Sequence, residues 1–252
     1  MNNKQLKLIA KQILPAYIRD RIKSQLQAYK HHPPLGKVRL GDLQSLKPIS
    51  SGWGFDRGQP IDRYYIENFL ARQSHDIHGR VLAIGDDFYT QQFGGDRVTK
   101  SDVLHIEDNP NATIIADLTD AEHILSDIFD CFLLVQTLQL IYEVRLAIKT
   151  SYRIMKPGGV ILATFPGITP LKDEEWNNCW CWNFTALSAQ RVFEEVFPKE
   201  NIQVETHGNV LTATAFLQGL AAQDIQKEKL DYHDPRYEVT ITVRAVKPEV
   251  SP

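Results

Sequence analysis

The sequence has only three cysteines, Cys131, Cys179 and Cys181, among 252 residues. Three cysteines cannot form a fully paired disulfide framework, and no spacing of histidine and cysteine is typical of a zinc site. We therefore expect no metal and a reducing compartment, which indicates the cytoplasm. The pair Cys179-x-Cys181 is interpreted as incidental.

Long apolar runs are also missing. No stretch approaches the roughly 18–20 apolar residues that a helix needs to cross a bilayer. The N-terminus has no compact apolar segment of the secretory type, because Lys4, Lys7 and Lys11 interrupt it. With 43% hydrophobic and 23% charged residues, the composition is that of an ordinary soluble protein.

Acidic residues are scarce at one end of the chain. Residues 1–32 carry seven Lys or Arg and one acid, Asp20, so this arm is about +6 and the remainder about −9. Apolar side chains recur at helical spacing over residues 3–30, and Pro15 is expected to split them into two short helices. The arm either packs on the main domain or forms a basic amphipathic surface for an anionic lipid or a phosphorylated partner.

The rest of the chain alternates apolar strands with helical segments. Strands are expected over residues 80–84, 98–103, 113–116, 131–135, 159–164, 202–206 and 237–245, and helices over 61–72, 90–93, 121–125, 144–155 and 186–196. This rhythm predicts an α/β fold, a Rossmann-like seven-stranded, mostly parallel sheet with helices on both faces. We assign residues 1–60 to a helical extension with a lead-in loop, and residues 61–252 to the main domain.

Three residues follow strands at the places where an open α/β sheet binds a nucleotide-type ligand. Gly85 ends the first strand and lets the backbone turn tightly beside a ligand. Asp102, near the end of the second strand, could accept hydrogen bonds from both ribose hydroxyls. Asp117, with the Leu118 amide, could meet an adenine after the third strand. The alternatives are a plain turn, a solvated Asp102 and a helix cap at Asp117.

A fourth feature joins two apolar strands through a helix. The first opens with Phe129-Asp130 and is followed by Gln136, and the second is preceded by Arg153-Ile154-Met155-Lys156-Pro157-Gly158-Gly159. Together with the glycine and the two acids in this order, these residues resemble the class I S-adenosylmethionine (SAM) dependent methyltransferases, in their small-molecule branch, type 11. The resemblance covers about residues 60–245 and includes Trp182-Asn183-Phe184-Thr185.

The resemblance implies SAM as the cofactor, with Gln136 at its methionine end. The implied cofactor contacts are Gly85, Asp102, Asp117, Leu118 and Gln136. The stretch 53–65 looks like the lead-in of a subgroup found fused to, or beside, glycosyltransferases, in which Arg57 or Arg63 would meet the SAM carboxylate. A packed aromatic loop with surface charges is the alternative for this stretch.

The chain departs from the family pattern in the glycine loop, where acid-x-Gly-x-Gly-x-Gly is replaced by Ala83-Ile84-Gly85-Asp86-Asp87-Phe88-Tyr89. Ala83 stands where the family has an acid that helps to hold the ammonium end of the cofactor. Asp87 and Tyr89 occupy the second and third glycine positions. Leu140 stands where many members carry a histidine after the fourth strand.

The resemblance implies methyl transfer to an oxygen of a small molecule, a sugar or a specialised metabolite. Asp56 and His207 are weak candidates for a base that takes the acceptor's proton, and each is more readily explained as structural. The alternative is a degenerate methyltransferase fold that acts as a partner or regulatory subunit, which the altered glycine loop motivates.

Two other classes of enzyme are disfavoured. A nicotinamide-dependent enzyme would carry Gly-x-Gly-x-x-Gly after the first strand. A nucleic-acid methyltransferase does not fit the acidic body or the missing Asn/Asp-Pro-Pro-Tyr/Phe motif. The sequence leaves the oligomeric state open.

Overall fold

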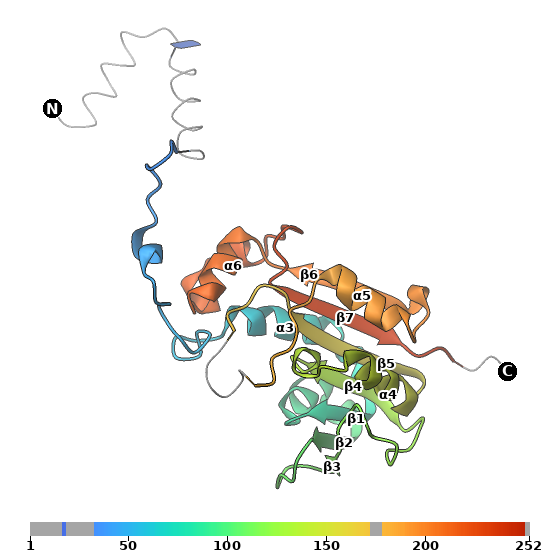
Figure 1. Cartoon of the computed structure of the whole chain (residues 1–252). Coiled ribbons are helices and arrows are strands. Elements are labelled where there is room, and N and C mark those ends of the chain that lie inside the picture. Colours follow the sequence, from blue (N-terminus) through green and yellow to red (C-terminus); the bar gives the residue numbers. More distant parts are fainter. Residues whose placement is uncertain (1–16, 19–32, 172–177, 250–252) are drawn as a thin grey trace. The chain divides into compact units, whose positions relative to one another are not determined.

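The computed structural model describes residues 17–18, 33–171 and 178–249 (Figure 1). The chain divides into two compact units, Met1–Leu46 and Lys47–Pro252. The two helices expected within residues 3–30 lie outside the described residues, apart from Tyr17 and Ile18, which are helical. In the smaller unit a short 3-10 helix spans Gly41–Gln44.

The larger unit is built on a seven-stranded sheet. Its strands are β1 (Gly79–Ile84), β2 (Val98–His105), β3 (Ile114–Ile115), β4 (Phe129–Val135), β5 (Met155–Pro166), β6 (Ile202–His207) and β7 (Thr240–Val246). Their order across the sheet is β3-β2-β1-β4-β5-β7-β6. β7 runs antiparallel to β5 and β6, and the other neighbours are parallel. The predicted α/β sheet is confirmed.

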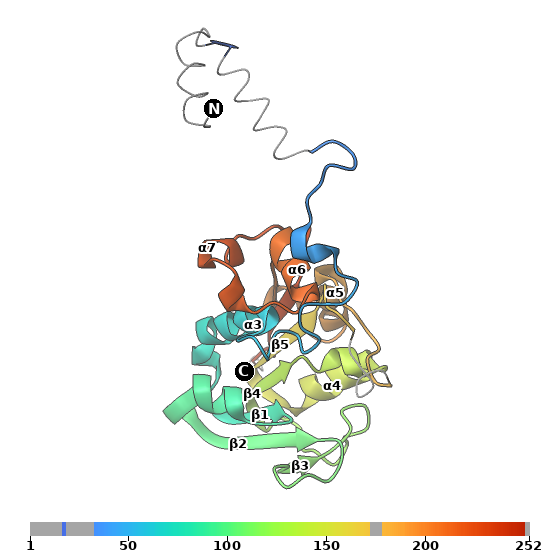
Figure 2. The same cartoon turned by 90° about the vertical axis from the view of Figure 1, so that its left-hand side faces the viewer.

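Helices cover both faces of this sheet. The helices are α3 (Ile61–Arg72), α4 (Val144–Ile154), α5 (Ala186–Glu194), α6 (Val210–Leu217) and α7 (Lys227–Leu230), with a π-helical turn at Thr90–Gly94. The apolar side of α3 packs on one face and α4 and α5 on the other (Figure 2). Buried on both faces, β1, β4 and β5 are near-continuous apolar runs.

Local sequence explains where the later helices begin. The Thr185 hydroxyl accepts a hydrogen bond from the Ser188 amide, and the Asn209 side chain accepts from the amides of Leu211 and Thr212. These are N-caps, which satisfy amides that have no partner within the helix. The sequence did not predict α6, because its eight residues are apolar on nearly every side and show no helical period. Short 3-10 helices span Ser74–Asp76, Gly95–Arg97, Leu138–Leu140, Lys199–Asn201 and Ala222–Asp224.

The helix expected over residues 121–125 is wrong, because this segment consists of turns and bends. The Arg153 guanidinium, on α4, donates to the carbonyl oxygens of Ala121 (2.7 Å) and Ile124 (2.6 Å). Ala121 and Ile124 are buried, so the segment still closes the core. Hydrogen bonds from a neighbouring helix thus replace those that a helix of its own would make.

The lead-in loop packs on the end of α6. The Ser50 amide donates to the Gln218 carbonyl (3.1 Å), and Pro60 forms an isolated bridge with Ala221. Gly219 has φ +69°, and a Cβ there would lie 2.0 Å from the Ser50 carbonyl oxygen. The loop from Lys47 onward therefore belongs to the larger unit.

We expect Gly219→Ala to destabilise the protein more than Gly95→Ala, by about 2 kcal/mol. Both glycines have positive φ, but a Cβ at Gly95 would meet no atom within 4 Å. Only the Gly219 variant therefore adds a backbone clash to the conformational strain. Urea unfolding of both variants gives the comparison, and equal losses would show that the contact with Ser50 is not tight.

Candidate functional site

A cavity of about 230 Å³ opens where β4 and β5 end. Gln136 follows β4, and Pro166 ends β5, so the cavity lies at the carboxyl edge of the sheet. Its wall combines α3, the lead-in loop, the segment after β4 and α6: Trp53, Phe55, Asp62, Arg63, Gln136, Gln139, Leu140, Pro166, Thr169, Trp180, Phe216 and Val239. Such an edge is where open α/β sheets bind ligands.

Two glutamine side chains in this wall have unpartnered polar atoms. Gln139 Nε2 donates to Gln136 Oε1 (3.3 Å). Among the described residues, Gln136 Nε2 and Gln139 Oε1 are buried and have no hydrogen-bond partner. Leaving a buried polar atom unpaired costs about 1–3 kcal/mol, so a polar ligand here would relieve the cost.

The backbone of Gln136 is also unusual. Its φ is +48°, which few residues other than glycine adopt. The Gln136 amide is held by Thr164 on β5, whose carbonyl oxygen (3.2 Å) and Oγ1 (3.1 Å) both accept from it. The turn after β4 is therefore fixed by the neighbouring strand. Gln136 lies where the sequence predicts a ligand contact.

Asp62 places a half-buried carboxylate in the same wall. Burial raises the pKa of Asp62 above its usual range, while the charge of Arg63 acts in the opposite direction. The Arg63 guanidinium donates to the Tyr89 hydroxyl (2.9 Å). Tyr89, at the third glycine position of the altered loop, thus connects that loop to α3. Sequence reasoning missed Asp62 as a site residue, because an acid in the first turn of a helix is usually solvated.

The turn after β1 leaves room for a ligand. Gly85 has φ +81°, and an added Cβ would meet nothing within 4 Å. Its amide donates to the Leu104 carbonyl of β2 (3.1 Å). Gly85 therefore forms an open turn whose amide is anchored to β2, and Ala83 before it offers no charged group.

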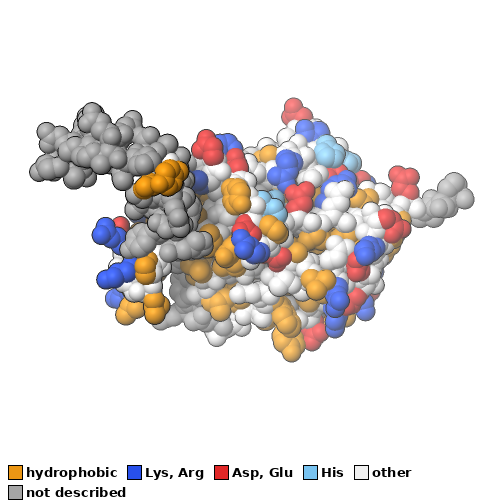
Figure 3. Space-filling model, turned by 90° about the horizontal axis from the view of Figure 1, so that it is seen from above, with side chains coloured by type: hydrophobic (Ala, Val, Ile, Leu, Met, Phe, Trp, Pro, Cys, Tyr) orange, Lys and Arg blue, Asp and Glu red, His pale blue; other side chains and the backbone are white. Residues whose placement is uncertain are grey.

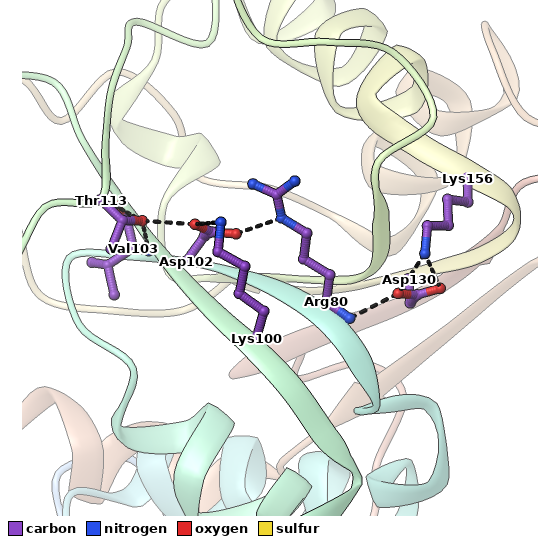
Figure 4. A network of polar contacts seen from close by, with 7 residues as sticks. All are labelled: Arg80, Lys100, Asp102, Val103, Thr113, Asp130 and Lys156. Atoms are coloured by element: carbon purple, nitrogen blue, oxygen red, sulfur yellow. Dashed lines mark hydrogen bonds and ion pairs between the residues drawn. The ribbon is translucent and has the colours of Figure 1, made fainter.

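Asp102 does not lie where the sequence suggested. It pairs with Leu82 in mid-sheet, three residues before β2 ends, and its side chain is only 2% exposed. Its carboxylate receives hydrogen bonds or ion pairs from Arg80 Nε (2.6 Å), Lys100 Nζ (3.2 Å) and Thr113 Oγ1 (3.1 Å) (Figure 4). Burial would raise the pKa of Asp102, but the bonds from Arg80 and Lys100 lower it below its usual range. Asp102 is therefore a structural ion rather than an open acceptor at the strand end.

Other groups occupy the end of β2. Since Ile84 pairs with Leu104, the next residue, His105, is level with Gly85. His105 Nε2 is buried without a hydrogen-bond partner among the described residues, and Glu107 is exposed two residues later. His105 and Glu107 are therefore polar groups at and just beyond the carboxyl end of β2.

Asp117 follows β3, at the edge of the sheet formed by the carboxyl ends of the parallel strands. One of its carboxylate oxygens, Oδ1, accepts from the Thr119 amide and hydroxyl, both at 2.8 Å. Asp117 thus stabilises a turn rather than the N-terminus of a helix. The Leu118 side chain beside it is buried.

Arg57 is not positioned to meet a ligand in the cavity. Its guanidinium makes a two-bond pair with Asp224, at 3.0 and 2.8 Å, which ties the lead-in loop to the segment after α6. Arg63, the other arginine considered from the sequence, lines the cavity. Asp56 accepts a hydrogen bond from Ser50, within the lead-in loop. Among the described residues, neither Arg57 nor Asp56 contributes to the cavity wall.

His207 lies at the end of β6 in a separate hollow of about 500 Å³. Its ring stacks on Tyr65, with centroids 5.6 Å apart, and Nε2 is 3.1 Å from Thr242 Oγ1. Burial, with the charges of Arg72 and His233, lowers the pKa of His207 to about 4. The side chain is therefore neutral near pH 7 and packs against α3, away from the cavity at β4.

Comparison with solved structures finds related folds. A SAM-dependent methyltransferase from Archaeoglobus fulgidus matches with a TM-score of 0.51 at 12% identity, over 73% of this chain and 94% of that one. The chain has the class I methyltransferase fold. The [4+2]-cyclase SpnF matches with a TM-score of 0.52 at 14% identity, over 89% of this chain and 96% of that one. Comparisons with protein-family models and with curated proteins find no match.

The name of the second structure describes a cyclase, so this fold alone does not decide the reaction.

Within the described ranges, no helix is long and apolar enough to cross a membrane, and no three His, Cys, Asp or Glu side chains are grouped to hold a metal ion. On the face shown in Figure 3, Lys and Arg side chains are interspersed with Asp and Glu.

His207 gives a prediction about acid stability. Because its pKa is near 4 when folded and about 6.5 when unfolded, only the unfolded chain binds its proton between these values. Stability should therefore fall by up to about 3 kcal/mol as pH drops from 6.5 to 4, and be unaffected by this group above 6.5. In urea unfolding across this range, the free energy of unfolding should depend less on pH in His207→Gln than in the wild type. The exposed His123 offers a control, and His123→Gln should keep the wild-type slope.

Proposed function

We propose that the chain binds SAM along the carboxyl edge of β1, β2 and β4, and transfers its methyl group to an oxygen of a small molecule in the cavity. The observation that carries this proposal is the pair of unpartnered amide atoms of Gln136 and Gln139 in a largely apolar wall with one carboxylate, Asp62. The class I methyltransferase fold supports it.

The residues present fit the cofactor at some positions. Gly85 leaves open space after β1, Gln136 and Arg63 offer donors for the methionine end, and Asp117 with Leu118 follows β3. When bound, SAM supplies an electrophilic methyl group on a sulfonium. Because Asp102 is buried, His105 and Glu107 are the proposed ribose contacts instead.

The acceptor side of the cavity suits one ring-sized group. Trp53, Trp180 and Phe216 provide flat apolar surfaces, and a cavity of about 230 Å³ lies below the usual 300–1,000 Å³ of sites that enclose a whole drug-sized ligand. We assign proton removal to Asp62. Transfer would form the bond from the acceptor oxygen to the methyl carbon and break the methyl–sulfur bond, leaving S-adenosylhomocysteine, and the Asp62 carboxylate would take the hydroxyl proton.

Calorimetric titration of the full chain with S-adenosylhomocysteine tests cofactor binding. We expect saturable binding, weakened about tenfold in Glu107→Gln because a charge-assisted hydrogen bond to the ribose is lost. Asp102→Asn is the matched control, and should keep the affinity while losing about 3 kcal/mol of stability, since Arg80 and Lys100 lose their counter-charge.

Two results would contradict these assignments. If Asp102→Asn lost the ligand and Glu107→Gln kept it, Asp102 would be the ribose contact after all. If the wild type did not bind at millimolar ligand, the cofactor assignment would fail. The alternative, a degenerate fold acting as a partner or regulatory subunit, would then be favoured.

Asp62→Asn tests the proton acceptor. With a hydroxyl-bearing acceptor that yields S-adenosylhomocysteine, we expect kcat to fall about 100-fold and the acidic limb of the pH profile to disappear, because the amide takes no proton. Affinity for S-adenosylhomocysteine should be unchanged. Glu67→Gln, on the same helix and bonded to Gln59 (2.7 Å), is the control and should keep both kcat and the pH profile. An unaltered kcat in Asp62→Asn would remove this role.

A further inference from the structure

A third hollow, of about 620 Å³, lies beside the cavity on the face of α4 and α5. Its wall is formed by the start of α4, the N-cap and first turn of α5, and the segment that leads into α5. The residues are Tyr142, Glu143, Val144, Arg145, Trp182, Asn183, Phe184, Thr185, Ser188 and Val192. We refer to this hollow as the aromatic groove.

Two stacked aromatic rings define the groove. The rings of Tyr142 and Trp182 lie 5.7 Å apart between centroids and are inclined by 24°. Tyr142 is 70% exposed and Trp182 is 38% exposed. Trp182 Nε1 donates to the carbonyl oxygens of Ile141 (3.1 Å) and Tyr142 (3.3 Å), which fixes the indole ring on the loop before α4. Trp182 is thus held in place, and Tyr142, stacked on it, leaves most of its own ring exposed as a flat aromatic surface.

The rim of the groove is polar and carries both charges. Glu143 is exposed, and Arg145 is paired with Glu195 (2.7 Å). Asn183 Oδ1 accepts from Trp180 Nε1 (3.1 Å), which leaves its amide hydrogens directed elsewhere. α4 begins at Val144 with no side-chain cap. Its Leu146 amide donates to the Glu143 carbonyl oxygen (3.0 Å), so the amides of Val144 and Arg145 are the donors left at this helix start. An aromatic surface whose edge carries one carboxylate, one paired guanidinium and neutral hydrogen-bonding groups does not select an ion of either sign.

One short segment separates the groove from the cavity at β4. Trp180 lines the cavity, and Trp182 lines the groove. The amides of Cys181 (2.8 Å) and Trp182 (3.1 Å) both donate to the carbonyl oxygen of Gln139, whose side chain lines the cavity. The two hollows therefore share a wall, and a ligand longer than one ring could extend from one to the other.

We propose that the aromatic groove is a carbohydrate-binding subsite, which holds sugar units of an extended acceptor next to the unit that reacts in the cavity. The C–H bonds on one face of a pyranose ring are polarised by neighbouring oxygens and pack on the negative face of an aromatic ring. Its hydroxyl groups then meet Glu143, Asn183 and the α4 amides. The link to the reacting unit rests on the proposed function, but sugar binding in the groove does not.

The size of the groove favours a sugar over a protein partner. A stable protein interface covers about 800 Å² on each side and is centred on anchors that fill pockets. Here two rings and a polar rim surround a compact hollow. The alternative occupant of the groove is a second copy of the chain, and the experiment includes a test for such a dimer.

Nuclear magnetic resonance of the full chain, without cofactor, tests the subsite. The protein is labelled with ¹⁵N at tryptophan and titrated with trisaccharides of glucose, galactose, mannose and N-acetylglucosamine, each to about 10 mM. The Trp182 indole signal is assigned by its loss in Trp182→Phe. We expect at least one trisaccharide to shift this signal saturably.

Variants separate stacking from general effects. Tyr142→Ala should weaken binding of that trisaccharide about tenfold, because one of the two stacked rings is lost. Tyr232→Ala, which removes a tyrosine that is 65% exposed outside the groove, should leave the affinity unchanged. Thermal unfolding of both variants checks that they are folded.

Each outcome decides one of the two proposals. No shift of the Trp182 signal with any trisaccharide would overturn the subsite, as would a wild-type dimer in sedimentation that Tyr142→Ala dissociates. Sugar binding by a protein that fails to bind S-adenosylhomocysteine would retain the subsite and remove the proposed function. Methyl transfer to a monosaccharide, with no lower KM for the trisaccharide, would retain the function and overturn the proposal that the groove holds the rest of the acceptor.

Discussion

The fold depends on a polar network that crosses the sheet below the candidate site. The Asp130 carboxylate accepts from the Arg80 amide (2.7 Å) and from Lys156 Nζ (2.8 Å), which joins the starts of β1, β4 and β5. The Arg80 side chain continues to Asp102 on β2, which Thr113 also contacts just before β3 (Figure 4). The network thus links β5, β4, β1 and β2, and reaches Thr113 before β3, through polar groups that are paired within the protein.

The residues of this network stabilise the sheet and lie apart from the candidate site. Asp130 and Lys156, which carried much of the resemblance to methyltransferases, lie at the amino edge of the parallel strands, whereas the cavity opens at their carboxyl edge. Motif residues can therefore be retained for the fold while the cofactor loop changes. The altered loop around Gly85 is compatible with an intact sheet, since the Gly85 amide donates to the Leu104 carbonyl of β2.

The sequence predicted the sheet well, because its inner strands are continuous apolar runs. It misplaced Asp102 because β2 continues to His105, so an acid that seemed to end the strand is inside it. Asp62 and Gln139 could not be recognised, since they meet only when the segment after β4 folds against α3. A polar residue on a helix is usually solvated, and no local pattern marks the exceptions.

The tyrosine in the glycine loop has a consequence for how a ligand enters. Glycines at these positions would leave the loop adaptable, whereas the Tyr89 hydroxyl is tethered to the Arg63 guanidinium and its ring lies against Phe93. Closure of this loop around a ligand would have to break the hydrogen bond between Tyr89 and Arg63. A ligand that needs this loop to move would therefore have to offset the loss of the Tyr89–Arg63 hydrogen bond, whereas a ligand that fits the existing shape would not.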